Sequence, residues 1–270
     1  MKKIPQDIIG NIAILKFPRR TLWITKKLRA RKFLKLHPKV TTVVEKTEKF
    51  SGKLRIPTTK YLAGEKTYIA HYKENDCTFK FNINKTYFSP RLSNERKVIA
   101  DEVAKIVAAS GKRQAASAKS KTFRILVMFA GISPYPIVIA RKLKQKNKTF
   151  HIYANELNKQ ANISAKENIR LNKLQKNITL ISGNANKIST KQKFDIILMP
   201  RPNLKETFLI PALKLSKKGT IIFYHGFGTK EEVLNEIKKD TKEKIGKVKI
   251  RKAGDIGPYK FRWQAIFKVK

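Results

Sequence analysis

The stretch from Lys121 to Lys142, KTFRILVMFAGISPYPIVIARK, constrains the fold more than any other part of the chain. Its first half, Phe123 to Phe129, is a nearly unbroken apolar run with the length of a buried parallel strand. The run stops at Ala130-Gly131, and an apolar helical pattern resumes at Ile137. This order indicates an open α/β sheet, in which a ligand binds where backbone N–H groups meet the carboxyl end of a strand. Similar turns occur in sheets that bind nothing there, so the stretch alone does not establish a ligand.

A second apolar run, Phe150 to Ala154, leads directly to Glu156. In nucleoside-binding α/β folds, a carboxylate at the end of the second strand accepts hydrogen bonds from ribose hydroxyls. The turn GISPYP lacks the second and third glycines of the dinucleotide-binding pattern. A single-nucleoside ligand such as S-adenosylmethionine therefore fits better than NAD, and Glu156 is the first predicted cofactor residue.

The charge balance predicts a polyanionic partner. The chain has 61 Lys and Arg residues against 19 Asp and Glu residues, a formal net charge of +42. RNA or DNA is favoured over an anionic membrane, because no long apolar segment or lipidation signal is present. A proteome rich in lysine would account for part of the excess. The single cysteine, Cys77, excludes an intramolecular disulfide and a multi-cysteine zinc site. The first residues lack an apolar signal core, so we expect a cytoplasmic protein.

Residues 1–84 are predicted to form a small basic α+β domain. Ile8 to Phe17 is typical of a strand interrupted at Gly10-Asn11. Arg19 to Lys39 carries nine basic residues and no acidic one, and predicts a helix with a cationic face that ends at His37-Pro38. The apolar stripe of this helix would be Leu22, Trp23, Leu28, Phe33, Leu34 and Leu36.

The rest of this domain is rich in strand signals. Val40 to Glu48, Tyr68 to Tyr72 and Thr78 to Ile83 are the predicted strands, with a possible hairpin through Ala63 to Lys66. We expect these strands to be antiparallel.

Residues 85–270 are predicted to form the second domain. An amphipathic helix from Lys97 to Ala109 and a loop from Ser110 to Thr122 precede the strand–turn–helix stretch. Repeated βα units follow, and Val248 to Val269 is predicted to form a terminal hairpin.

Five motifs in a fixed order carry a family resemblance. They are YFSPRLSNER, MFAGISP, YANELN, KENIRLNK and GTIIFYHGFG. Together they resemble the archaeal-type tRNA (guanine-N1)-methyltransferases and their relatives in wyosine biosynthesis. The resemblance covers nearly the whole chain, including IIGNIAILKF and LKLHPKV in the small RNA-facing domain. It implies a Rossmann-like class I methyltransferase fold of the α/β class, S-adenosylmethionine as cofactor, tRNA as partner, no metal and a monomer.

The resemblance also implies roles for single residues. The general base of the family falls on Glu95, and its catalytic arginine on Arg55 in the segment Gly52 to Arg55. Guanine N1 carries a proton near neutral pH, so a carboxylate must accept it while a cation stabilises the charge on O6. The cofactor positions of the family fall on Phe129, Ala130, Gly131, Pro134, Glu156, Asn184 and Met199.

Because N1 lies on the pairing edge, the target base must be unpaired or flipped out. Tyr87, Phe88 and Tyr135 are candidates to stack on it, with core packing the expected fate of Phe88.

Several positions depart from the family pattern. Val127 replaces an acid, Ser133 a glycine and Asn184 an acid, while Pro200 stands where a catalytic asparagine is expected. Arg201 is a candidate to replace that asparagine. The predicted activity is methylation of N1 of the guanosine 3′ of the anticodon. Aminocarboxypropyl transfer and a non-catalytic RNA-binding protein with a decayed core remain alternatives. A DNA or protein methyltransferase would carry an N/D-P-P-Y-like motif, which this chain lacks.

The charge pattern gives a first prediction. If the basic stretch from Arg19 to Lys39 neutralises RNA phosphates, log Kd for tRNA should change linearly with log salt. The slope should be about 0.7 per contact on single-stranded segments. Fluorescence anisotropy with labelled tRNA across a salt series measures it, and a flat response would contradict the prediction.

Overall fold

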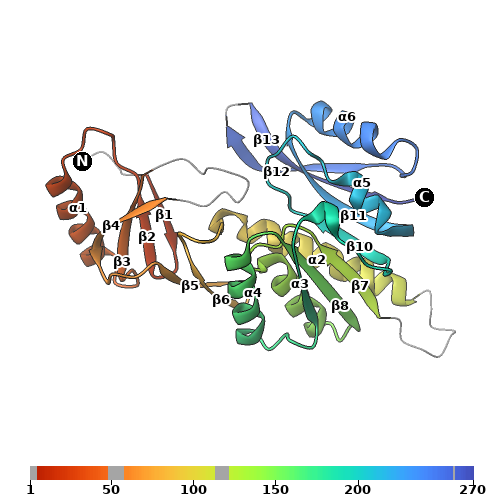
Figure 1. The fold of residues 1–270 in the computed structure, drawn as a ribbon, viewed down its shortest axis with the longest axis horizontal. Coiled ribbons are helices and arrows are strands. Elements are labelled where there is room, and N and C mark those ends of the chain that lie inside the picture. Colours follow the sequence, from red (N-terminus) through yellow and green to blue (C-terminus); the bar gives the residue numbers. More distant parts are fainter. Residues whose placement is uncertain (1–4, 48–57, 113–121, 258) are drawn as a thin grey trace.

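The computed structural model describes residues 5–47, 58–112, 122–257 and 259–270. Within these residues the chain forms a four-stranded sheet, a two-stranded hairpin and a seven-stranded sheet. Figure 1 shows the small sheet at one end of the long axis and the large sheet at the other. No helix in the described part of the chain is long and apolar enough to cross a membrane.

The small sheet has the strand order β1-β2-β3-β4. β1 and β2 form the interrupted strand that the sequence predicts. Their turn needs Gly10, because its φ is +58° and a Cβ there would lie 1.7 Å from the His71 carbonyl oxygen. The elements are β1 (Gln6–Ile9), β2 (Ile12–Leu15), α1 (Trp23–Leu36), β3 (Thr42–Lys46) and β4 (Thr59–Gly64).

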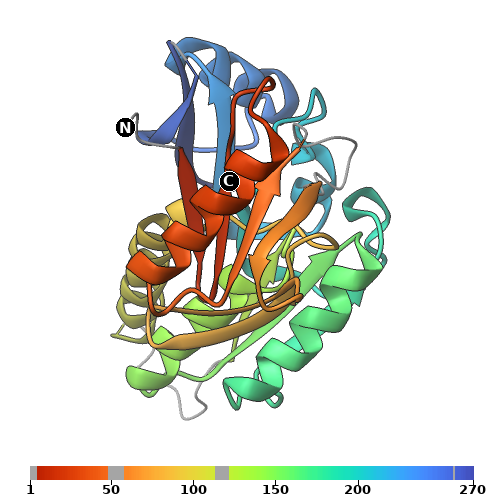
Figure 2. The same cartoon turned by 90° about the vertical axis from the view of Figure 1, so that its left-hand side faces the viewer.

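The prediction of a purely antiparallel domain was wrong. β2 and β3 pair in parallel, because α1 connects them as a crossover on one face of the sheet. Figure 2 shows α1 lying across that face. Only a narrow stripe of α1, with Ala30 at its centre and Phe33 and Leu34 beside it, packs on the sheet. Four other residues expected in the stripe, Leu22, Trp23, Leu28 and Leu36, are exposed.

The predicted hairpin through Ala63 to Lys66 was also wrong. β4 pairs with β3, whereas β5 (Ile69–Glu74) pairs with β6 (Cys77–Asn82). The backbone N–H of Glu65 donates to Thr41 O, and Thr42 Oγ1 donates to Glu65 O. These bonds hold the chain against β3 after β4 ends, so it does not fold back on β4.

The β5–β6 hairpin packs on α4 (Lys159–Leu171), a helix of the large unit that is built around the seven-stranded sheet. Two side-chain amides make this contact. Asn168 Oδ1 accepts the N–H of Lys80 at 2.7 Å, and Asn172 both accepts from and donates to the backbone of Thr78. Asn168 Nδ2 also donates to Ile132 O. How the chain divides into domains stays a prediction, because the hairpin contacts both units.

The large sheet has the order β12-β13-β11-β10-β7-β8-β9. β7 to β11 are parallel, and the terminal hairpin adds two antiparallel strands, as expected. The strands are β7 (Phe123–Val127), β8 (Phe150–Glu156), β9 (Ile178–Ser182), β10 (Phe194–Met199), β11 (Ser216–Gly228), β12 (Lys249–Gly257) and β13 (Lys260–Lys268). The α/β fold class predicted from the sequence is confirmed.

Helices cover both faces of this sheet, which explains the continuous apolar run of β7. Ile125 and Val127 face one core, with side chains of α2, α3 and α4, and Leu126 and Met128 face the other, with α5 and α6. The helices not yet bounded are α2 (Ser93–Lys112), α3 (Pro134–Gln145), α5 (Leu209–Lys214) and α6 (Lys230–Thr241). α2 extends over Ser110 to Lys112, which the sequence had placed in a loop, and residues 113–121 of that loop lie outside the described residues.

The amide contacts of α4 generate a stability prediction. Asn168→Ala leaves the part-buried N–H of Lys80 and the buried C=O of Ile132 without these partners. The unpaired buried carbonyl alone should cost about 1–3 kcal/mol. Urea unfolding should therefore show a lower midpoint. Asn235→Ala removes an exposed asparagine in the middle of α6, so it is the matched control and should cost far less. Equal midpoints for the two variants would contradict the prediction.

Candidate active site

A pocket of about 220 Å³ lies where parallel strands β7, β8 and β10 end. The strand order reverses here, since the chain goes from β7 to β8 and β9 on one side and returns to β10 on the other. An open α/β sheet binds its ligand at such a switch point.

The turn after β7 forms one wall of the pocket. Phe129, Gly131 and Ser133 have left-handed φ values of 57°, 58° and 66°. Residues other than glycine seldom adopt this conformation, and such strain clusters at ligand sites. The N–H of Ala130 donates to Asn155 O at 2.8 Å, which pins the turn to the end of β8.

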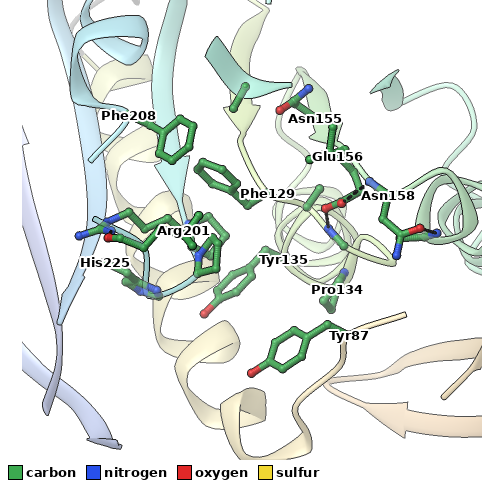
Figure 3. A pocket seen from close by; sticks show the side chains of 18 of the residues that line it. Tyr87, Phe129, Pro134, Tyr135, Asn155, Glu156, Asn158, Arg201, Phe208 and His225 are labelled. Carbon is green, nitrogen blue, oxygen red and sulfur yellow. Dashed lines mark hydrogen bonds between the residues drawn. The ribbon is translucent and has the colours of Figure 1, made fainter. Parts of the chain in front are cut away.

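Glu156 stands at the end of β8 and lines the pocket, as predicted. Its Oε2 accepts the N–H of Gly131 at 2.7 Å, and its Oε1 accepts the N–H of Asn158 at 2.7 Å (Figure 3). Burial raises the pKa of Glu156, although the backbone hydrogen bonds from Asn158 and Gly131 oppose the rise. The carboxylate is therefore fixed in place, with its remaining lone pairs available to hydroxyl donors.

Aromatic and amide groups form the next part of the wall. The rings of Phe129 and Phe208 meet edge to face, with centroids 4.8 Å apart (Figure 3). Asn184 lines the pocket and accepts the N–H of Asn186. An apolar slot beside an amide suits a flat heterocycle such as adenine.

The segment after β10 is braced by Arg201, which is buried. Its Nη1 donates to the carbonyl oxygens of Leu204 and Glu206, and its Nη2 pairs with the Glu236 carboxylate at 2.7 Å and 2.9 Å. Because these bonds occupy both terminal nitrogens, Arg201 holds the pocket wall. It does not supply the amide that Pro200 lacks.

Glu95 sits at the start of α2, behind the pocket rather than on its surface. Arg251 of β12 donates to both of its carboxylate oxygens at 2.9 Å, and His225 Nε2 lies 3.4 Å from Oε1. Burial pushes the pKa of Glu95 upward, but His225 and Arg251 outweigh it and hold the pKa below the ordinary glutamate value. Glu95 is therefore an ionised, buried carboxylate. Its neighbour Arg96 forms a buried pair with Glu74.

A larger groove of about 620 Å³ adjoins the pocket and reaches the small sheet. The two share Tyr87, Phe88, Ser89, Leu92 and Arg262 among their lining residues. Arg262 is the charged member of this shared set, and its guanidinium lies 5.4 Å from the centroid of the Phe227 ring. A polymer lying in the groove can thus present one unit to the pocket.

The structure gathers six predicted cofactor residues in one pocket, and they are Phe129, Ala130, Gly131, Pro134, Glu156 and Asn184. It does not bring Met199 there, because that side chain is fully buried in the core on the α5–α6 face. Arg55 lies outside the described residues. Phe88 is packed against Tyr72 and Phe81, as expected, and it lines the pocket together with Tyr87 and Tyr135.

Sequence reasoning missed His225 and Arg262. His225 lines the pocket from β11, and a lone histidine inside the apolar run IIFYHGF was the available signal. No group of three or more His, Cys, Asp and Glu side chains that could hold a metal occurs in the described residues.

Comparisons with known proteins agree with this geometry. The pattern of the TRM5/TYW2 methyltransferase domain matches residues 70–251, and that of the TYW2 N-terminal domain matches residues 4–67. The chain belongs to the TRM5/TYW2 methyltransferase family. The family predicted from the sequence, with its class I methyltransferase fold, is confirmed.

Individual relatives support the assignment to this family. The chain is 32% identical to the tRNA (guanine(37)-N(1))/4-demethylwyosine(37)-methyltransferase Taw22 of Nanoarchaeum equitans, over 95% of this chain and 96% of that enzyme. It is also 32% identical to the tRNA (guanine(37)-N(1))-methyltransferase Trm5b of Pyrococcus abyssi, where the match covers 82% of this chain and 59% of the longer enzyme.

Solved structures give the same picture. The crystal structure of Trm5b from P. abyssi superimposes with a TM-score of 0.78 at 29% identity, covering 98% of this chain and 75% of that one. The structure of P. horikoshii TYW2 in complex with MeSAdo has a TM-score of 0.74 at 22% identity, covering 98% and 90% of the two chains, and shows the fold alone.

The position of Glu156 generates a binding prediction. Glu156→Ala should weaken S-adenosylmethionine binding by about 1–3 kcal/mol, because it removes charged acceptors from the ribose hydroxyls. Isothermal titration calorimetry measures the loss. Glu167→Ala, at a half-buried position of α4 that pairs with Lys80 and does not line the pocket, is the control. Unchanged affinity in the Glu156 variant would remove this residue from the site.

The pH dependence tests the same carboxylate. Because the pKa of Glu156 is raised, protonation should begin at a higher pH than for an ordinary glutamate, and affinity should fall as pH decreases through that range. The affinity of Glu156→Gln should be lower and nearly independent of pH there.

Proposed function

We propose that this protein is an S-adenosylmethionine-dependent tRNA methyltransferase that methylates N1 of the guanosine at position 37, 3′ of the anticodon. The observation that carries the proposal is the pocket at the switch point, in which Glu156 is fixed by the N–H groups of Gly131 and Asn158. The full-length match to an enzyme named for this reaction supports it.

The pocket residues fit the cofactor. Glu156 offers acceptors for two ribose hydroxyls, and Phe129, Phe208 and Asn184 surround a slot for the adenine. When bound, S-adenosylmethionine supplies an electrophilic methyl group on a sulfonium sulfur. The described residues contribute binding and orientation, which bring the acceptor atom into line with that methyl group.

The adjoining groove fits the RNA. It runs from the pocket towards the small sheet, where residues of β1, β2, β3 and β4 line it, and Lys16, Lys46 and Arg91 are among its lining residues. On the outer side of the same unit, Arg31, Lys32 and Lys35 of α1 are exposed. A phosphate backbone bound along the groove would leave one flipped base at the pocket. The related protein aTrm5, which is 24% identical to this chain, has a known structure in complex with tRNALeu.

The proton on guanine N1 must leave as the methyl group arrives. The ionised Glu95 carboxylate, with a pKa held low by His225 and Arg251, is the anionic group that we assign to this step. The stabilising cation assigned to Arg55 remains a proposal, as do the monomeric state and the cytoplasmic location.

A second substrate has its own support. The N. equitans relative is also named for 4-demethylwyosine at position 37, and Pro200 leaves this chain without the side-chain amide expected to contact guanine. Aminocarboxypropyl transfer is not favoured, because the relatives named above are methyltransferases. Incubation with labelled cofactor and bulk archaeal tRNA, followed by nucleoside mass spectrometry, distinguishes the three products. The absence of any labelled nucleoside would refute the proposal.

Replacement of the carboxylate gives a kinetic prediction. In Glu95→Gln the single-turnover rate should fall by roughly 10²–10⁴, while cofactor and tRNA binding stay nearly intact. The loss should shrink as pH rises, because N1 then loses its proton to solvent. Glu167→Gln serves as the control. A Glu95→Gln protein as fast as the parent would leave Glu95 as a helix-start residue only.

A further inference from the structure

Arg262 differs from the other two arginines that line the pocket. Arg96 pairs with Glu74 and Arg201 pairs with Glu236, so a carboxylate of the protein neutralises each of them. Within the part of the chain that the structure describes, no ion pair or hydrogen bond involves the Arg262 guanidinium. The side chain is half-buried, so its charge has lost part of its hydration without gaining an anionic partner. Such a cation is suited to an anion that a ligand supplies.

The sheet fixes the direction of this side chain. Arg262 lies in β13, where it pairs with Phe227 of β11 on one side and with Gly254 of β12 on the other. Its guanidinium packs over the Phe227 ring, 5.4 Å from the centroid, which orients the cation. His225 lies two residues before Phe227 in β11, on the same face of the sheet, and lines the pocket. Arg262 therefore shares the face of the sheet that borders the pocket.

An irregularity in β12 leaves space beside Arg262. The pairing of β12 with β13 shifts between Lys252 and Gly254. Gly254 has a φ of +135°, and a Cβ there would meet no other heavy atom within 4 Å. Bulges are frequent next to active sites, where they redirect side chains. Gly254 lines the groove but not the pocket, whereas Arg262 lines both, so Arg262 lies where the groove meets the pocket.

The acidic residues of the groove do not oppose an anion at this junction. The described lining residues include two acids, and both are paired, Asp7 with Arg91 at 2.7 Å and Asp255 with Lys252 at 2.8 Å. A phosphate at Arg262 would therefore meet a cation whose charge is not already neutralised.

We propose that Arg262 binds a phosphate next to the nucleotide whose base enters the pocket, an inference that rests on the proposed methyl transfer. A base that flips out of its strand leaves its flanking phosphates in the strand, at the mouth of the pocket that receives the base. A guanidinium can donate two parallel N–H bonds to phosphate oxygens. This contact fixes the strand at the end of the groove, and so helps to hold the acceptor atom in line with the methyl group.

The test uses the full chain and tRNAs assembled by ligation. Each carries one methylphosphonate, which removes the charge of a single phosphate, on the 5′ or the 3′ side of the guanosine at position 37. The nucleotide 5′ of the methylphosphonate has a 2′-deoxy sugar, because a 2′-hydroxyl would attack the modified group, and a reference tRNA has the same sugar with a normal phosphate.

Fluorescence anisotropy measures binding of each tRNA. One of the two modifications should weaken binding by the parent protein roughly 10–100-fold. Arg262→Gln should weaken binding of the reference tRNA by a similar factor, and the same modification should then have little further effect, because its partner is gone. Losses on modification that are the same in parent and variant would overturn the inference.

The salt dependence gives a second readout, which a purely structural role would not change. Arg262→Gln should lower the slope of log Kd against log salt by about 0.7, the value for one contact on a single-stranded segment. Arg262→Lys keeps the charge without the planar fork, so it should keep the slope and recover part of the affinity. Arg124→Gln is the matched control, because Arg124 is exposed at the start of β7 and lines neither the pocket nor the groove. An unchanged slope in Arg262→Gln would contradict the phosphate contact.

Calorimetry with S-adenosylmethionine separates this role from a contact to the cofactor. Arg262→Gln should bind the cofactor as tightly as the parent, which also shows that the variant is folded. Weaker binding would place the guanidinium on the cofactor carboxylate and overturn the inference. A parent enzyme that transfers no methyl group would refute the proposed function, whereas the binding measurements would still report on Arg262.

Discussion

One half-buried carboxylate, that of Glu156, fixes the geometry of the site. Glu156 ends β8, and its two oxygens accept the N–H of Gly131 in the left-handed turn and the N–H of Asn158 before α4. Three segments thus meet on one side chain, and the turn can keep its unusual φ values because its freed N–H has a charged partner. Burial raises the pKa of Glu156, because the carboxylate loses part of its hydration. Hydroxyl groups of a bound ligand would donate hydrogen bonds to the carboxylate and offset this loss.

The start of α2 is a second point of convergence. Glu95 and Arg96 are adjacent, yet Glu95 pairs with Arg251 of the C-terminal hairpin and Arg96 pairs with Glu74 of β5. Successive helical positions point about 100° apart, so neighbouring residues reach in different directions. The motif YFSPRLSNER therefore joins the β5–β6 hairpin and the C-terminal hairpin beside the pocket.

Local patterns predicted much of this structure, and long-range contacts account for what they missed. Strand β7, the turn after it and the position of Glu156 could be predicted, because the hydrophobic periods of strands and helices are local properties of the sequence. The parallel pairing of β2 with β3 depends on where α1 packs, and the failed hairpin after Gly64 depends on bonds to Thr41 and Thr42. The partnership of Glu95 with Arg251, residues far apart in the sequence, has no local signature.

The amides of Asn168 and Asn172 act on β6 as a neighbouring strand would. Four residues along a helix rise about 6 Å, and two residues along a strand rise about 6.6 Å, so the spacing of the two asparagines matches that of Thr78 and Lys80. Their oxygen and nitrogen atoms occupy the ladder positions of the open edge of the hairpin. An unprotected edge can recruit strands from other molecules. Asn168 and Asn172 therefore cover this edge of β6 with side chains of the same molecule. Their bonds also fix the register of the hairpin against the cofactor-binding unit.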